Sequence, residues 1–205
     1  MIKNNLLFIL LIVVATSLVV SLSYERGLFG LTGYASSGTA ITSVNLTQEI
    51  SIAVTGNIDF GTGRVNADAP NATLDSNAGT VTGGSWTPIE DYINIENDGT
   101  VNITLNVTAE EDNNAAGLIG GTSPEFKIKG NITESGACAG TLVQTWTSMP
   151  NSTESPINIC NLLNFAQSSD EFNVSVKLSI PNDAEAGSRN ATLTFSASCV
   201  GAACP

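Results

Sequence analysis

Strict alternation of apolar and polar residues, repeated in several short segments, constrains this chain more than any other feature. In residues 171–180 every second side chain from Phe172 to Ile180 is apolar, and those between are polar. Residues 101–108 and 190–198 repeat the pattern. Because successive side chains of a β-strand point to opposite faces, this period of two predicts strands with one buried face. Less regular segments predict further strands at residues 50–54, 91–96, 126–128, 142–147 and 157–163.

Turn-forming residues separate these segments. Asn97-Asp98-Gly99, between residues 91–96 and 100–108, predicts a β-hairpin, and Pro181-Asn182-Asp183 opens the last connection. After the first 23 residues no helix longer than a turn or two is evident. About eight half-buried strands predict an all-β fold, an antiparallel β-sandwich of the immunoglobulin-like or jelly-roll-like type, preceded by one hydrophobic N-terminal helix.

The N-terminal helix is predicted from an uncharged apolar run at residues 6–22, which follows Lys3. As a helix this run is about 25 Å long, between the core of a signal peptide and a full membrane span. Residues 1–23 are therefore either a signal peptide, with small residues for cleavage after Ser23 or Ala35, or an N-terminal membrane anchor. If the run is not cleaved, residues 6–22 hold the protein at the membrane.

Both outcomes place the remainder of the chain outside the cell, because the positive charge at the start stays inside. Residues 24–39 are rich in Gly and Ser and predict a linker. Residues 40–205 form the predicted sandwich domain. We therefore expect an extracellular or cell-surface localisation.

Cysteine usage agrees with an exported protein. The four cysteines, an even number, predict two disulfides, and three pairings satisfy that count. We favour Cys138 with Cys160 and Cys199 with Cys204, because a glycine in Cys-Val-Gly-Ala-Ala-Cys can turn the chain back over a short distance. A four-cysteine metal site is disfavoured, because the intervals lack the C-x2-C pairs of structural zinc.

Charge and composition exclude several functions. The chain has 7 Lys and Arg against 19 Asp and Glu, a net charge of -12, and no histidine. A Ser-His-Asp or Cys-His nucleophile and a His-ligated zinc site are therefore excluded. Nucleic acid is not an expected partner, because neutralising phosphates needs clustered Lys and Arg. We expect no enzymatic activity.

Two acidic clusters are the best candidates for catalytic residues, whose presence would contradict that expectation. Glu90-Asp91 and Glu110-Glu111-Asp112 could act in a carbohydrate-active hydrolase only if two carboxylates faced each other across an aromatic-lined cleft. Trp86 and Trp146 could line a sugar groove, as in a carbohydrate-binding module, but a Trp among strands more often belongs to the core. No metal site is assigned. Calcium is the one candidate cofactor, at residues 110–114, because Glu110-Glu111-Asp112-Asn113-Asn114 places hard oxygen ligands in one loop. A second segment, Asp75-Ser76-Asn77-Ala78-Gly79, starts like an EF-hand loop and then departs from it.

N-glycosylation sequons, Asn-x-Ser/Thr, are the most specific recurring motif. There are eight, about twice the number that the Asn, Ser and Thr content predicts by chance. Asn102, Asn106, Asn173 and Asn190 fall on the solvent side of predicted strands, where a sugar can be borne. We predict glycosylation at Asn45, Asn71, Asn102, Asn106, Asn131, Asn151, Asn173 and Asn190.

The order of scaffold motifs supports a resemblance. Ile58-Asp59-Phe60-Gly61, the segment Ile93 to Ile103, and Ile180 to Gly187 leading to Ala191 to Phe195 follow one another, after a leader and Leu31 to Ala35. In this order the chain resembles the secreted β-sandwich proteins of archaeal cell surfaces. The resemblance covers most of the chain and implies a scaffold without catalytic residues.

At the level of architecture alone the chain is similar to camelysin-type biofilm fibre proteins and archaeal bundling pilins. In those, an N-terminal strand of one subunit completes the sandwich of the next. Ser37 to Leu46, with Ala40, Thr42 and Val44 on one side, could be such a donor strand. We favour the alternative that it is an ordinary first strand of its own sheet.

These observations predict an exported structural or adhesive protein of the cell surface, glycosylated and disulfide-bonded. A filament subunit that assembles by donor-strand complementation is the alternative. A carbohydrate-active hydrolase or a carbohydrate-binding module is the third hypothesis. The expected partners are further copies of the chain or other cell-surface proteins.

Overall fold

The computed structural model describes residues 47–110 and 112–201 of the 205-residue chain. One compact unit spans Leu46–Pro205. The predicted leader (1–23), linker (24–39) and donor segment (37–46) lie outside the described residues.

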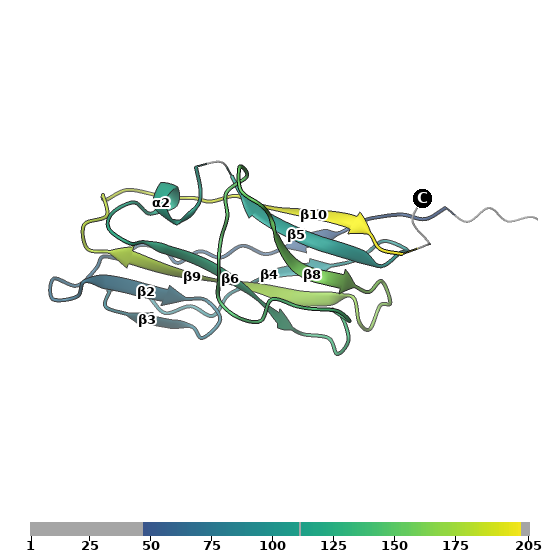
Figure 1. Ribbon diagram of the computed structural model, residues 1–205. Coiled ribbons are helices and arrows are strands. Elements are labelled where there is room, and N and C mark those ends of the chain that lie inside the picture. The colour runs from purple at the N-terminus through teal and green to yellow at the C-terminus, as the bar shows by residue number, and fades with distance from the viewer. Residues whose placement is uncertain (1–46, 111, 202–205) are drawn as a thin grey trace, which may run out of the picture. The chain divides into compact units, whose positions relative to one another are not determined.

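The described part consists almost entirely of antiparallel strands, which confirms the all-β prediction (Figure 1). Every predicted strand except residues 142–147 corresponds to one of those observed, with ends that differ by a few residues. A single short helix, α2 (Ala115–Leu118), is present in this part of the chain. The strands are β1 (Ala53–Thr55), β2 (Asn71–Asp75), β3 (Thr80–Thr82), β4 (Ile93–Glu96), β5 (Ile103–Ala109), β6 (Glu125–Ile132), β7 (Thr147–Ser148), β8 (Ile157–Leu163), β9 (Glu171–Pro181) and β10 (Leu193–Cys199).

The larger of the two sheets is organised around β9. Along one edge β9 pairs with β6, and along the other it pairs first with β4 and then with β2. Each of these three neighbours has an outer partner of its own, β7, β1 and β3 respectively. The smaller sheet has the order β10-β5-β8.

The two sheets share one hydrophobic core. Every second side chain of β5, from Ile103 to Ala109, is fully buried, as the alternation predicts. Phe172 and Val174 of β9 are fully buried as well and belong to the same cluster. The two sheets therefore pack face to face, with polar side chains on their outer faces.

Ser76 fills the junction where β2 and β4 meet along β9. Its side chain is fully buried. The Ser76 Oγ accepts a hydrogen bond from the Val176 N–H at 3.0 Å, and the Ser76 N–H donates to the Val176 carbonyl at 3.0 Å. The Ser76 hydroxyl thus satisfies the Val176 N–H, at a point on β9 that lies between its pairings with β2 and β4.

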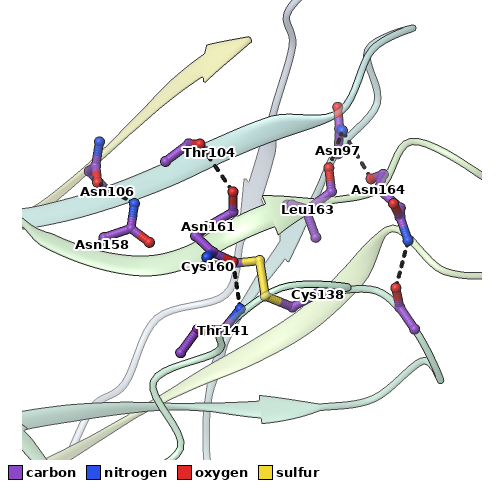
Figure 2. Close-up of a disulfide and its surroundings, with 11 residues drawn as sticks. Asn97, Thr104, Asn106, Cys138, Thr141, Asn158, Cys160, Asn161, Leu163 and Asn164 are labelled. Atoms are coloured by element: carbon purple, nitrogen blue, oxygen red, sulfur yellow. Dashed lines mark hydrogen bonds between the residues drawn. A yellow bond between two sulfur atoms is a disulfide. The ribbon is translucent and has the colours of Figure 1, made fainter. Parts of the chain in front are cut away.

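The hairpin predicted at Asn97-Asp98-Gly99 is wrong. β4 belongs to the larger sheet and β5 to the smaller, so this turn crosses between the sheets. The reason is Asn97, whose side chain is 1% exposed. Its Nδ2 donates to the carbonyl of Asn164 at 2.9 Å (Figure 2). The Nδ2 also donates to the carbonyl of Val101 at 2.9 Å, and the Oδ1 accepts from the Gly99 N–H.

The strand predicted at residues 142–147 is also different from the observed structure. Only Thr147 belongs to a strand, β7, whereas Leu142 forms an isolated bridge with Cys160. Residues 137–143 run along β8 instead, and the amides of Ala139 and Val143 donate to carbonyls of β8. This irregular segment covers the free edge of β8.

Candidate functional site

The sequons lie on the outer faces of both sheets. Asn71, Asn131 and Asn173 are on the outer face of the larger sheet, in β2, β6 and β9. Asn102 and Asn106 are on the outer face of the smaller sheet, just before and within β5. Asn151 and Asn190 lie in loops. Asn45 lies outside the described residues.

Neighbouring polar side chains orient most of the sequon amides. The Nδ2 groups of Asn71 and Asn131 donate to the hydroxyls of Ser179 and Ser175, both at 2.9 Å. In contrast, Asn106 and Asn173 accept through Oδ1 from the amides of Asn158 and Asn94. Because an amide nitrogen carries two hydrogens, one donated bond still leaves one hydrogen for replacement by a sugar.

Asn151 occupies a tight surface turn that resembles a capping box. Its Oδ1 accepts from the hydroxyl of Thr153 at 2.8 Å and from the Thr153 N–H at 3.2 Å. Its own N–H donates to the carboxylate of Glu154 at 2.9 Å. The turn holds the carbonyl side of the amide inward and leaves Nδ2 facing away from these partners.

Cys138 and Cys160 are joined, which is the pairing that we favoured. Their sulfur atoms are 2.14 Å apart and their Cα atoms 5.9 Å apart (Figure 2). The bond ties the segment at residues 137–143 to β8, and Cys160 is fully buried. Cys199 is disulfide-bonded too, and Cys204 lies outside the described residues. A buried disulfide is typical of an oxidising compartment.

The prediction that the two tryptophans belong to the core is wrong. Both Trp86 and Trp146 are half-buried and neither belongs to the buried cluster. Trp86 lies directly against Gly63 and Gly84, where any side chain would collide with the indole ring.

Trp146 lies beside two lysines of the larger sheet. The Nζ of Lys129, in β6, is 5.0 Å from the centre of the indole, and the Nζ of Lys177, in β9, is 5.5 Å away. Both distances are within the range of a cation–π interaction. We call these three residues the Lys–Trp cluster.

The two acidic clusters lie in different connections: Glu90-Asp91 precedes β4, and Glu110 and Asp112 lie between β5 and α2, whereas Glu111 lies outside the described residues. Glu90 packs against Gly79, and the Asp91 N–H donates to Ser76, whereas Glu110 accepts from Asn113 in the loop before α2. A shallow pocket of about 350 Å³ near this loop contains one carboxylate, Glu154, and no aromatic side chain.

The EF-hand-like segment is the turn between β2 and β3. The Oδ1 of Asp75 accepts from the N–H groups of Asn77 and Ala78, and its Oδ2 lies 3.4 Å from Lys177 Nζ. In the described ranges, no group of three or more His, Cys, Asp or Glu is arranged to hold a metal ion.

Two carboxyl groups have shifted pKa values. Burial raises the pKa of Asp170, and the nearby Glu134 carboxylate raises it further. At the exposed Asp183 the pKa is lowered, because the hydroxyl and the N–H of Thr122 donate to the carboxylate at 2.6 Å and 2.9 Å. Neither residue was a sequence-based candidate, since nothing in the local pattern places Glu134 beside Asp170.

The edge of β10 that faces away from β5 has no strand partner among residues 47–110 and 112–201. Val200 N–H donates to Asn102, and Glu110 N–H donates to Thr192, so the even-numbered residues of β10 bond to β5. The backbone groups of Leu193, Phe195 and Ala197 therefore point to the open side. Their side chains face the core but remain half-buried.

Comparison with known proteins identifies no relative: no family model, no curated protein and no solved structure matches this chain. Within the described residues, α2 is four residues long, and no helix has the length and apolar character that crossing a bilayer requires.

Proposed function

We propose that this chain is an exported structural or adhesive component of a cell surface. Its described part would be an immunoglobulin-like β-sandwich, carried outward by the N-terminal signal peptide or anchor. The observation that carries the proposal is the placement of five sequons on the two outer faces, because sugars attached there do not disturb the core.

Further features support this role. The described surface is rich in amides and hydroxyls, and the Cys138–Cys160 disulfide stabilises the chain where thiols oxidise. Hydrolysis of a glycosidic bond needs two carboxylates, whereas the pocket beside α2 contains one. These features favour display and contact over catalysis.

Mass spectrometry of the native protein tests the proposal. We expect an intact mass above that of the polypeptide, glycopeptides at several of the eight Asn positions, and removal of the domain by protease applied to whole cells. A bare polypeptide mass together with protection from external protease would contradict it.

A filament subunit is the second candidate function, and the open edge of β10 favours it. An edge that presents the backbone groups of Leu193, Phe195 and Ala197 above half-buried apolar side chains is a site for strand addition. The occupant would be residues 37–46 of a neighbouring copy, which lie outside the described residues.

A proline substitution in β10 distinguishes the filament function from the structural or adhesive function. Ala197 directs its N–H to the open side, so Ala197→Pro removes a donor from the edge and leaves the bonds to β5 intact. We expect filaments of the native protein in electron micrographs and none for Ala197→Pro. Ser196→Pro, which removes a bond to β5, is the control for a general loss of stability. Filaments of Ala197→Pro with normal length would exclude assembly through this edge.

A further inference from the structure

Positive charge is concentrated on one face of an otherwise acidic protein. The described residues include five lysines and arginines, namely Arg64, Lys127, Lys129, Lys177 and Arg189. Three of these lie on the outer face of the larger sheet. Lys127 and Lys177 are direct cross-strand partners, and Lys129 follows two residues along the same face of β6.

The carboxylates nearby do not neutralise this face completely. Lys127 pairs with Glu125 at 2.7 Å and Lys177 with Asp75 at 3.4 Å. Among the ion pairs of the described residues none involves Lys129, whose ammonium group contacts the Trp146 indole. Like charges directly opposite each other in a sheet are destabilising, so this arrangement has a cost in stability.

We propose that the Lys–Trp cluster binds a glycan that carries an acidic sugar. The half-buried indole of Trp146 offers a flat apolar surface for a sugar ring, and the ammonium groups of Lys129 and Lys177 hold its carboxylate. This proposal assigns a ligand class to the adhesive role, and it rests on the cell-surface location proposed above.

The surroundings of the cluster favour a saccharide over a peptide. Around the lysines the outer face presents the half-buried amides of Asn131 and Asn173, which suit sugar hydroxyls. An extended peptide needs a free strand edge, but β9 is paired along both edges, and the outer edge of β6 is bonded to β7 and to the carbonyl of Val143.

The ligand must also carry few negative charges. A nucleic acid carries a phosphate about every 1.7 Å and needs many cations, whereas a glycan with one carboxylate per disaccharide needs few. At physiological ionic strength the remote carboxylates of the protein are screened beyond about 8 Å. The local positive charge therefore decides the interaction.

Affinity electrophoresis with two saccharides tests the inference. The full chain is produced without N-glycosylation, so that no sugar at Asn131 or Asn173 covers the face. The probes are a hyaluronan tetrasaccharide, which alternates glucuronate with N-acetylglucosamine, and chitotetraose, its uncharged counterpart. We expect the hyaluronan probe to bind and chitotetraose to bind at least about tenfold more weakly.

Single variants assign the binding to the cluster. Lys129→Ala and Trp146→Ala each weaken binding about tenfold, and Trp146→Phe, which keeps an aromatic ring, weakens it less. Arg189→Ala removes the same charge from a distant loop and leaves binding unchanged. Thermal melts of every variant show that it is folded, and Lys129→Ala, which leaves the indole in place, keeps the test valid if a Trp146 variant is unstable.

Three results overturn the inference: equal binding of the two saccharides, binding that is unaffected by Lys129→Ala and Trp146→Ala, or tighter binding of a polyglutamate peptide to the same residues. Surface exposure and glycan mass are measured separately. Failure of saccharide binding therefore leaves the proposed function intact.

Discussion

Asn97 shows at the level of one residue how a turn can hold two sheets together. Its amide is buried between β4, β5 and the end of β8, and its Nδ2 also reaches the Leu163 carbonyl at 3.3 Å. Asn97 is 1% exposed, so the three carbonyls that share this donor lose their partner inside the protein when the amide is removed. A buried polar group without a partner costs about 1–3 kcal/mol.

Asn97→Ala is therefore expected to lower the free energy of unfolding by about 2–4 kcal/mol, a fall in Tm of roughly 5–15 °C. Asn97→Asp keeps the acceptor for Gly99 but sets a carboxylate against carbonyls, so we expect at least the same loss at neutral pH. Thermal unfolding measures both. The exposed neighbour Asp98→Ala should stay within about 0.5 kcal/mol of the parent, and an equal effect there would contradict a special role for Asn97.

Asp170 gives the protein a carboxyl that is better tolerated when protonated. Burial and Glu134 raise its pKa in the folded state above the ordinary value of 3.8. The folded state thus binds this proton more tightly than the unfolded chain does. The contribution of Asp170 to stability is greatest in acid and declines as the pH rises through the raised pKa.

Asp170→Asn is expected to raise Tm at pH 7, because it removes an ionised group from a buried site beside Glu134. The difference from the parent should shrink as the pH falls toward 3.8, where the parent carboxyl is protonated as well. Glu134→Gln, which can still accept from the Asp170 N–H, should act in the same direction. A gain in Tm that is independent of pH would show that charge is not the cause. The stability contribution of Asp183 has the opposite dependence on pH. Because its pKa is lowered in the folded state, its ionised carboxylate stabilises the fold, and this contribution is lost as the pH falls through the lowered pKa.

At the level of elements, the Cys138–Cys160 bond decides whether residues 137–143 stay on the edge of β8. The two cysteines are separated by 22 positions, and closing such a loop stabilises the folded state by about 3 kcal/mol in the chain-entropy model. Hydrogen bonds and the packing of Ala137, Leu142 and Val143 against the core hold the rest of this irregular segment. The disulfide therefore acts as the permanent attachment of an edge that has no regular strand.

The double variant Cys138→Ser/Cys160→Ser is expected to lose about 3 kcal/mol and to speed hydrogen exchange at the amides of Ala139 and Val143 first. Hydrogen-exchange mass spectrometry measures the order of opening. Cys199→Ser/Cys204→Ser provides the matched control, because it removes two cysteines far from β8 in sequence. Simultaneous exchange throughout β8 and β5 would mean that the segment does not open independently.

Strands could be predicted from the sequence where the alternation extends over many residues, but the pairing between strands could not. β5 and β9 have four or five inward apolar residues each, so their faces follow directly from the pattern. β2 was missed because it has only two, Ala72 and Leu74. The separation of β4 from β5 depends on Asn97 contacting residues 163 and 164, which no local pattern reveals.

The candidate site could be predicted from the sequence to a similar extent. The sequons are visible as motifs, and their outward direction follows from the alternation. The Lys–Trp cluster has a partial signal, since Lys127 and Lys129 lie two residues apart beside a predicted strand. Their meeting with Lys177 depends on the register of β6 against β9, and Trp146 joins them from a segment without alternation.

At the scale of the whole molecule, acidity governs how copies of the protein meet. The chain carries a net charge of -12, so copies repel each other at low salt. We expect self-association to increase as the salt concentration is raised from about 20 mM to about 500 mM, since the screening length falls from roughly 20 Å to below 5 Å. Light scattering measures the interaction between copies. Repulsion that does not change with salt would show that charge is not what keeps them apart.

β9 is the common partner of β6, β4 and β2, yet it begins only at Glu171. A chain that crosses a membrane from its N-terminus delivers β9 late, after every sequon up to Asn151 has already emerged. Until then β2, β4 and β6 have no central strand on which to assemble. In the export that we propose, this interval leaves those asparagines on an unfolded chain, open to a glycosylating enzyme before the sheet is complete.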